Sequence, residues 1–285
     1  MSECSTCTRE SCSAKNQQPQ ENDEQFVERQ KLEKRLCKIK HKVAVMSGKG
    51  GVGKSTVAAN VALTLARKGY QVGLLDIDVH GPSVPTLFGL QDARLEQDET
   101  GILPIIPMPN LKLMSAGFLL QHPDQALIWR GPMKAGAIKQ LLSDVAWGEL
   151  DYLIVDCPPG TGDEALAICQ TITDMDGALI VTTPQEMAAA DVRKSITFCK
   201  QIELPIIGII ENMSGFICPH CAGEIHPFKK GGGKTIADLF SLPFLGGIPL
   251  DIDMMNHADS GSLMDHIHHP EIFNTLIDPL TKLKG

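Results

Sequence analysis

One stretch, SGKGGVGKST from 47 to 56, constrains the fold of this chain more than any other. It follows a short apolar run at 43–46 and precedes a segment in which apolar residues recur every four positions from 57 to 65. Gly48 to Ser55 match the pattern G-x-x-x-x-G-K-[ST] between a strand and a helix. Glycines let such a loop wrap closely around phosphate groups while the helix N-terminus faces the anion. The sequence therefore predicts a phosphate-binding P-loop.

Individual residues of the loop have distinct predicted roles. Lys54 supplies a positive charge to the phosphates, and the hydroxyl of Ser55 is a ligand for Mg²⁺. We expect the following residues to contact the nucleotide: Gly48, Lys49, Gly50, Gly51, Val52, Gly53, Lys54, Ser55 and Thr56.

The rest of the body predicts an α/β fold of the P-loop NTPase type. Short apolar runs alternate with longer amphipathic segments, a pattern typical of a mainly parallel twisted sheet with helices on both faces. A helix is expected from about Lys54 to Lys68, with Gly69 as its stop. We expect strands at 43–46, 72–75, 153–155, 178–182, 206–210 and 244–245.

Three segments outside these strands and helices have distinctive compositions. Residues 1–40 predict a cysteine-containing tail with a short helix after residue 21, and 41–285 form the P-loop domain. The Pro-rich segment 101–110 predicts a loop or an edge segment. KKGGGKT at 229–235 predicts a flexible loop, because Phe228 stands where a second P-loop would need its first glycine.

Composition limits the partners and the compartment. The net charge of −8 gives no support for nucleic-acid binding through a basic surface, and no uncharged apolar run of about 18 residues is present. The N-terminus has neither a secretory nor a transit pattern, and nine unevenly spaced cysteines favour a reducing compartment. We expect a cytoplasmic protein that binds neither nucleic acid nor membrane.

Lys49, directly after the first glycine, makes the loop K-G-G-V-G-K-S-T. This loop resembles that of the deviant-Walker ATPases, which include the nitrogenase iron protein and the division-site and partitioning ATPases. The resemblance implies that Lys49 reaches across a homodimer to the partner's nucleotide. It also implies that ATP controls the geometry of the dimer.

Two strand ends carry carboxylates that fit the same ATPases. By resemblance, LLDIDVHGPS is the first switch, in which Asp78 orients the attacking water and Asp76 is either a second functional carboxylate or a strand-end cap. Asp156, in YLIVDCPPGTGD, matches the Walker B aspartate that holds Mg²⁺ through its water shell. Asn212 stands where related ATPases contact adenine, and no guanine-reading Asn-Lys-x-Asp sequence occurs, so ATP is favoured over GTP.

Six blocks, in order along the chain, narrow the resemblance: SGKGGVGKST, DIDVHGPSVP, WRGPM, VDCPPGTGD, TTPQEMAAADVRKS and ENMSGFICPHC. Together they resemble the Mrp/ApbC-type iron–sulfur cluster carrier ATPases. The resemblance implies an ATPase that binds a [4Fe–4S] cluster, received from assembly donors or built on the protein, and passes it to apo-proteins.

The spacing of Cys218 and Cys221 agrees with this function on chemical grounds. A [4Fe–4S] cluster is held by four thiolates, and one C-x-x-C segment supplies two of them. Two identical chains related by a two-fold axis complete the set, so ligand count also predicts a homodimer.

Several alternatives remain open at this point. Cys218 and Cys221 are also suited to a structural zinc site in a positioning or partitioning ATPase, or to disulfide exchange. A nitrogenase-like electron donor is less consistent with the sequence, because its cluster ligands come from widely separated cysteines. The tail cysteines Cys4, Cys7 and Cys12 are candidates for a second metal site, in which a fourth cysteine ligand could only be Cys37.

Overall fold

The computed structural model describes residues 17, 21–78, 81–119, 131–218 and 220–283. A central sheet is built from strands β1 (Ile39–Ser47), β2 (Val72–Asp76), β5 (Ile105–Met108), β6 (Leu111–Ser115), β7 (Leu150–Asp156), β8 (Gly177–Thr182), β9 (Ile206–Asn212) and β12 (Phe244–Ile248). Its strand order is β12-β9-β8-β1-β7-β2-β6-β5, and every neighbouring pair is parallel except β5 with β6. Two short hairpins lie outside the sheet, β3 (Gln97–Asp98) with β4 (Gly101–Ile102) and β10 (Phe216–Ile217) with β11 (Glu224–Ile225).

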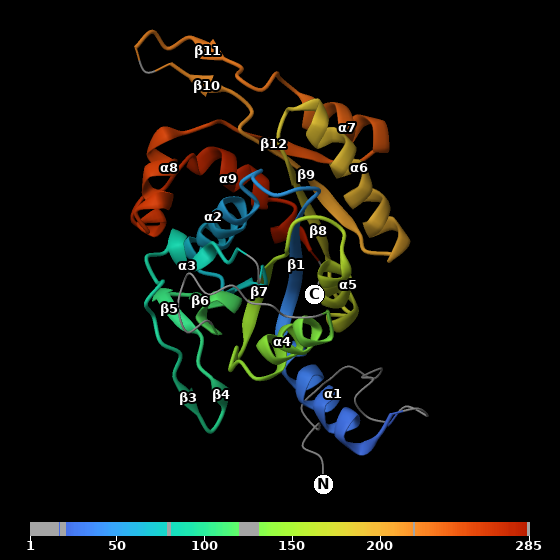
Figure 1. Ribbon diagram of the computed structural model, residues 1–285. Coiled ribbons are helices and arrows are strands. Elements are labelled where there is room, and N and C mark those ends of the chain that lie inside the picture. The colour runs from blue at the N-terminus through green and yellow to red at the C-terminus, as the bar shows by residue number, and fades with distance from the viewer. Residues whose placement is uncertain (1–16, 18–20, 79–80, 120–130, 219, 284–285) are drawn as a thin grey trace.

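Helices cover both faces of the sheet (Figure 1). They are α1 (Asp23–Leu36), α2 (Lys54–Arg67), α3 (Val84–Leu87), α4 (Gly131–Ser143), α5 (Asp163–Thr171), α6 (Glu186–Gln201), α7 (Gly232–Phe240), α8 (Ile252–Asp259) and α9 (Pro270–Ile277). Helices α2, α3, α8 and α9 pack on one face, whereas α4 to α7 pack on the other. The predicted mainly parallel sheet with helices on both faces is confirmed.

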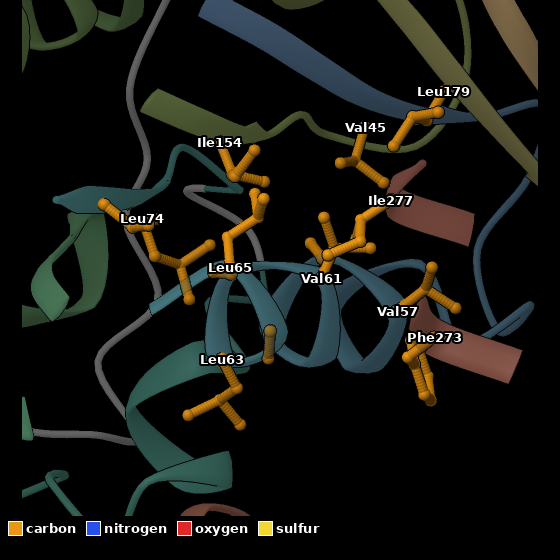
Figure 2. Close-up of a cluster of buried hydrophobic side chains, with 14 of the residues drawn as sticks. Val45, Val57, Val61, Leu63, Leu65, Leu74, Ile154, Leu179, Phe273 and Ile277 are labelled. Carbon is orange, nitrogen blue, oxygen red and sulfur yellow. The ribbon is translucent and has the colours of Figure 1, made fainter. Parts of the chain in front are cut away.

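Helix α2 is the element that joins the P-loop to the core. Val57, Val61 and Leu65 lie on its inner face and are almost completely buried. Figure 2 shows this face of α2 against the sheet near Val45, with Phe273 of α9 beside the helix. Each such apolar side chain contributes about 1.5–3 kcal/mol by its removal from water, so α2 is held rigidly behind the loop.

Each predicted strand lies within an observed one, but β6 was not predicted. Lys112 interrupts its apolar run, and the buried environment of Leu111 and Leu113 depends on pairing with β2, which is distant in the sequence. The segment 101–110 contains β5, which is one of the two edge strands of the sheet, in agreement with the predicted loop or edge segment.

The prediction of a flexible loop at 229–235 is wrong for its second half. Helix α7 begins at Gly232, after Gly231 in the left-handed region with φ of 77°. Ile236 and Ala237 are buried in a cluster with Ile209 of β9, so tertiary packing stabilises a helix that the glycines alone disfavour.

The predicted N-terminal helix is present as α1. Asn22 and Gln25 form a capping box at its start, and Leu32 and Leu36 are buried in the cluster that also contains α4 residues. Lys31 forms an ion pair with Asp144 at 2.6 Å. Strand β1 begins at Ile39, and the division of the chain at residue 40 into tail and domain stays a prediction. In the described ranges, no helix is both long enough and apolar enough to span a membrane.

Candidate nucleotide site and thiol hairpin

The P-loop connects the carboxyl end of β1 to the N-terminus of α2. Gly51 and Gly53 have φ of 76° and 77°, in the left-handed region that favours glycine. Gly53 is the N-cap of α2 and no side chain caps the helix there. The first N–H groups of α2 therefore have no side-chain cap, and with the positive end of the helix dipole they suit a phosphate group.

Lys54 and Asp156 form a buried ion pair at the base of this loop. The Nζ of Lys54 lies 2.6 Å from Oδ1 of Asp156, and 3.4 Å from Oγ of Ser55. Burial lowers the pKa of Lys54, but the Asp156 carboxylate outweighs this effect and the pKa is raised overall. The lysine therefore stays charged.

The same residues fit a magnesium ion. Oδ2 of Asp156 is buried and has no hydrogen-bond partner among the described residues. A carboxylate and the Ser55 hydroxyl are the oxygen ligands that Mg²⁺ prefers, with water and phosphate oxygens completing the octahedron. The unsatisfied Oδ2 of Asp156, beside the phosphate loop, is suited to accept a hydrogen bond from a water molecule bound to that ion.

Asp76 and Asp78 at the end of β2 play different parts. Asp76 pairs in register with Asp156, and its carboxylate accepts hydrogen bonds from the backbone N–H groups of Asp78 and Val84 and from Oγ of Ser115, at 2.9–3.2 Å. Burial, reinforced by the Asp156 charge, raises the pKa of Asp76 to about 7. Asp76 therefore organises the loop that follows β2.

Asp78 is partly exposed, and its carboxylate accepts a hydrogen bond from the Gly81 N–H at 3.2 Å. Its role in orienting water stays a prediction. Ser115, the hydroxyl partner of Asp76, was missed by the sequence reasoning. Its position at the end of β6 became meaningful only once β6 was placed beside β2.

Asn212, at the carboxyl end of β9, lies against the P-loop. Its Nδ2 donates to the Val52 carbonyl at 2.9 Å, and a Cβ on Gly53 would lie 2.2 Å from the same nitrogen. Asn212 thus supports the loop directly, while its predicted contact with adenine stays a prediction. Lys49 is partly exposed, and its carbonyl accepts a hydrogen bond from Oγ of Ser47 at 2.9 Å.

Cys218 and Cys221 lie at the tip of the β10–β11 hairpin, which projects from the body in Figure 1. Cys221 is exposed, Cys218 is partly exposed, and neither forms a disulfide. Backbone N–H groups of His220 and Cys221 lower the pKa of the Cys218 thiol. A thiolate is the form that binds metal and acts as a nucleophile, so the hairpin presents a ready ligand.

Within the described residues, no group of three or more His, Cys, Asp or Glu side chains is placed to hold a metal ion. The hairpin therefore offers two thiols from one chain. A four-coordinate metal or cluster needs ligands from elsewhere.

The remaining cysteines are placed apart from the hairpin or fall beyond the description. Cys4, Cys7 and Cys12 lie outside the described residues. Cys37 follows α1, which lies at the end of the molecule opposite the hairpin in Figure 1. Cys157, Cys169 and Cys199 are buried or partly buried and their thiol pKa values are raised, chiefly by burial, so they do not resemble metal ligands.

Comparison with known proteins places this geometry in a family. A family model described as NUBPL iron-transfer P-loop NTPase matches residues 38–281. The iron-sulfur cluster carrier protein of Methanocaldococcus jannaschii is 49% identical over 252 residues, which cover 88% of this chain and 87% of that relative. The cytosolic Fe-S cluster assembly factor CFD1 of Saccharomyces cerevisiae is 51% identical over 222 residues, covering 76% of each chain.

Solved structures agree with the architecture. A nucleotide-binding protein from Archaeoglobus fulgidus in complex with ADP has a TM-score of 0.74 and 42% identity, covering 83% of this chain and 93% of that one. The cell division ATPase MinD of Pyrococcus furiosus has a TM-score of 0.58 at 20% identity, covering 86% and 99%, and shows the fold alone. The resemblance expected from the six sequence blocks is confirmed, and the chain belongs to the family of NUBPL iron-transfer P-loop NTPases.

Proposed function

We propose that this protein is an ATP-dependent carrier that binds a [4Fe–4S] cluster as cargo and transfers it to apo-proteins. The observation that carries the proposal is the position of Cys218 and Cys221. They form an accessible thiol pair on a hairpin that leaves the sheet directly after Asn212, the residue that touches the P-loop. The names of the relatives in Methanocaldococcus jannaschii and Saccharomyces cerevisiae support iron–sulfur cargo.

Two chains share the cluster in this proposal. One hairpin supplies the sulfur atoms of Cys218 and Cys221, and a second copy related by a two-fold axis supplies the other two ligands. Lowering of the Cys218 pKa by neighbouring N–H groups favours the thiolate that iron requires. The same N–H groups can donate to cluster sulfurs and tune how tightly the cargo is held.

ATP hydrolysis uses residues of the P-loop and the strand ends. The backbone of residues 48–56 binds the phosphates, and Lys54 leaves Asp156 to pair with them. Ser55 and, through water, Asp156 hold Mg²⁺, which neutralises charge on the phosphates when bound. Asp78 orients the attacking water, and Lys49 reaches the nucleotide of the partner chain. Asn212 contacts adenine.

The names of some relatives also support a cellular location for the proposed function. We place the protein in the cytoplasm because relatives named cytosolic assembly factors match most of its length. Its partners are then cluster assembly donors, apo-proteins that receive the cluster, and a second copy of the chain. The acidic net charge of −8 supports neither nucleic acid nor anionic membrane as a partner.

The test is the content of iron, sulfide and zinc per chain after anaerobic purification and reconstitution. We expect about two iron and two sulfide per chain in the wild type and a loss of both in Cys218→Ser. Cys169→Ser, which removes a partly buried thiol away from the hairpin, is the matched control and should keep its iron. Zinc in the wild type with no reconstitutable iron would contradict the proposal.

A variant of the tail separates the second candidate site. Replacing Cys4, Cys7 and Cys12 together by serine removes the three tail thiols and keeps Cys218 and Cys221. Iron or zinc lost from this variant, but kept in Cys218→Ser, would belong to the tail.

A further inference from the structure

Glu211 is a buried carboxylate that holds the start of α7. It is 2% exposed and accepts hydrogen bonds from the N–H of Gly233 at 2.6 Å and of Gly231 at 3.4 Å. Among the described residues it forms no ion pair with lysine or arginine. Its contacts with α7 are therefore the hydrogen bonds that it accepts from these two amides.

The three glycines at 231–233 permit this contact. A Cβ on Gly232 would lie 2.5 Å from the Pro184 carbonyl oxygen, and a Cβ on Gly233 would lie 3.0 Å from the Cβ of Glu211. Gly231 adopts φ of 77°, which favours glycine. The run of glycines thus brings the first turn of α7 against β9, with the carboxylate seated on its amides.

Asn212, the next residue of the same strand, forms a hydrogen bond with the P-loop. Successive side chains of a strand point to opposite faces of the sheet, and Ile209 and Ile210 accordingly belong to cores on opposite faces. Glu211 therefore faces α7, whereas Asn212 faces α2 and donates to the Val52 carbonyl at 2.9 Å. Two adjacent residues at one strand end hold two different elements.

Residues 213–231, the thiol hairpin, connect the strand end at Asn212 to the start of α7 and include β10 and β11. It leaves the sheet after Asn212, carries Cys218 and Cys221, and returns at Gly231. Its outgoing side is held by the Ser214 N–H on the Ile248 carbonyl at 2.9 Å. Its returning side is held by Glu211. The outgoing end is therefore tied to β12 and is continuous with Asn212, whereas the returning end is tied by hydrogen bonds to Glu211 of β9.

We infer that Glu211 is a positioning residue that ties the returning end of the thiol hairpin to the strand end contacting the P-loop, so that nucleotide binding at the loop alters the hairpin. The inference uses the proposed function only for its consequence, which is that nucleotide state changes how the cysteines are presented. Its test needs no cluster.

The experiment is hydrogen–deuterium exchange of the reduced full chain, with and without Mg²⁺ and a non-hydrolysable ATP analogue. In the wild type we expect the analogue to change exchange in peptides from 213–231 as well as in the P-loop. In Glu211→Ala the P-loop should still be protected, whereas the response of the hairpin is lost. Glu211→Gln keeps an acceptor for the Gly233 N–H and should restore the response.

Asp176→Ala is the matched control. Asp176 also accepts a backbone N–H, from Lys42 at 2.8 Å, but at the opposite end of β8 from the nucleotide site, so the hairpin response should remain. Glu211→Asp retains the charge with a shorter side chain, and we expect a weakened response. It carries the test if Glu211→Ala does not fold.

Three results would overturn the inference. The analogue could leave hydrogen–deuterium exchange of the wild-type hairpin unchanged, or it could change exchange of the hairpin in Glu211→Ala as much as in the wild type. The third result is failure of Glu211→Gln to restore the change in exchange. The last result would assign the effect to loss of charge at the helix. A protein that responds in this assay but binds no iron would refute the proposed function and leave the role of Glu211 standing.

Discussion

Replacing Lys54 by methionine should destabilise the nucleotide-free protein, and more strongly at pH 8 than at pH 5.5. The ion pair with Asp156 spans 2.6 Å with both side chains buried, which corresponds to an attraction of about 6 kcal/mol at an effective dielectric constant of about 20. Desolvation offsets part of this energy in the intact pair. Removing one partner leaves a buried charge uncompensated, a change that costs about 3–5 kcal/mol.

The pH dependence follows from the carboxylates left behind. Asp76 is buried beside Asp156 and already has its pKa raised to about 7, mainly by burial, and loss of the lysine charge raises the pKa of both carboxyls further. A carboxyl whose folded pKa exceeds its unfolded value costs stability as the pH rises from the unfolded pKa toward the folded one. The variant should therefore lose most stability above neutral pH, where the buried carboxyls must ionise.

The assay is urea unfolding monitored by circular dichroism, in EDTA and without nucleotide, at pH 5.5 and pH 8. Adding Asp156→Asn to the lysine variant should recover much of the loss, because it removes one buried charge. Lys40→Met is the matched control: Lys40 also lies 2.6 Å from a carboxylate, that of Asp151, but its side chain is 69% exposed, so the free energy of unfolding should hardly change. A Lys54→Met variant as stable as the wild type at pH 8, or equally destabilised at both pH values, would refute the reasoning.

Three further predictions use other parts of the molecule. Gly53→Ala would place an alanine at φ of 77° with its Cβ 2.2 Å from Nδ2 of Asn212, so the P-loop would have to change shape. We expect ATP affinity, measured by calorimetry, to fall about tenfold or more, and an unchanged affinity would contradict the loop geometry. Phe273→Ala, at a fully buried site, should lower the free energy of unfolding by about 3–5 kcal/mol in urea titration, and a loss below about 1 kcal/mol would show that α9 is not part of the core. Iodoacetamide at pH 7.5 should label Cys218 of the reduced protein long before Cys157, as peptide mass spectrometry can measure, and the reverse order would contradict the opposite directions of their pKa shifts.

Local patterns account for what could be predicted from the sequence. The P-loop lies between a strand and a helix that adjoin it in the chain, so its fold and the position of Lys54 follow from neighbouring residues. Asp156 was identified at the end of a predicted strand by the resemblance of YLIVDCPPGTGD to a Walker B segment. For such sites a short stretch of sequence contains most of the determining contacts.

Contacts between distant segments account for what was missed. Ser115 meets Asp76 because β6 pairs with β2, and Glu211 meets Gly233 because α7 returns to β9 after the hairpin. The glycines at 231–233 were therefore interpreted as part of a flexible loop. In the structure, the carboxylate of Glu211, on an earlier strand, accepts hydrogen bonds from this segment and stabilises the start of a helix there. Only the assembled sheet places these pairs together.

The central claim is that two chains share one [4Fe–4S] cluster through Cys218 and Cys221. Native mass spectrometry of the anaerobically reconstituted full chain tests it most directly, because it reports the oligomer and the bound atoms in one measurement. The claim predicts a dimer carrying a mass increment of about four iron and four sulfide, absent from Cys218→Ser. A monomer that carries the complete cluster, or a dimer that carries only zinc, would contradict it.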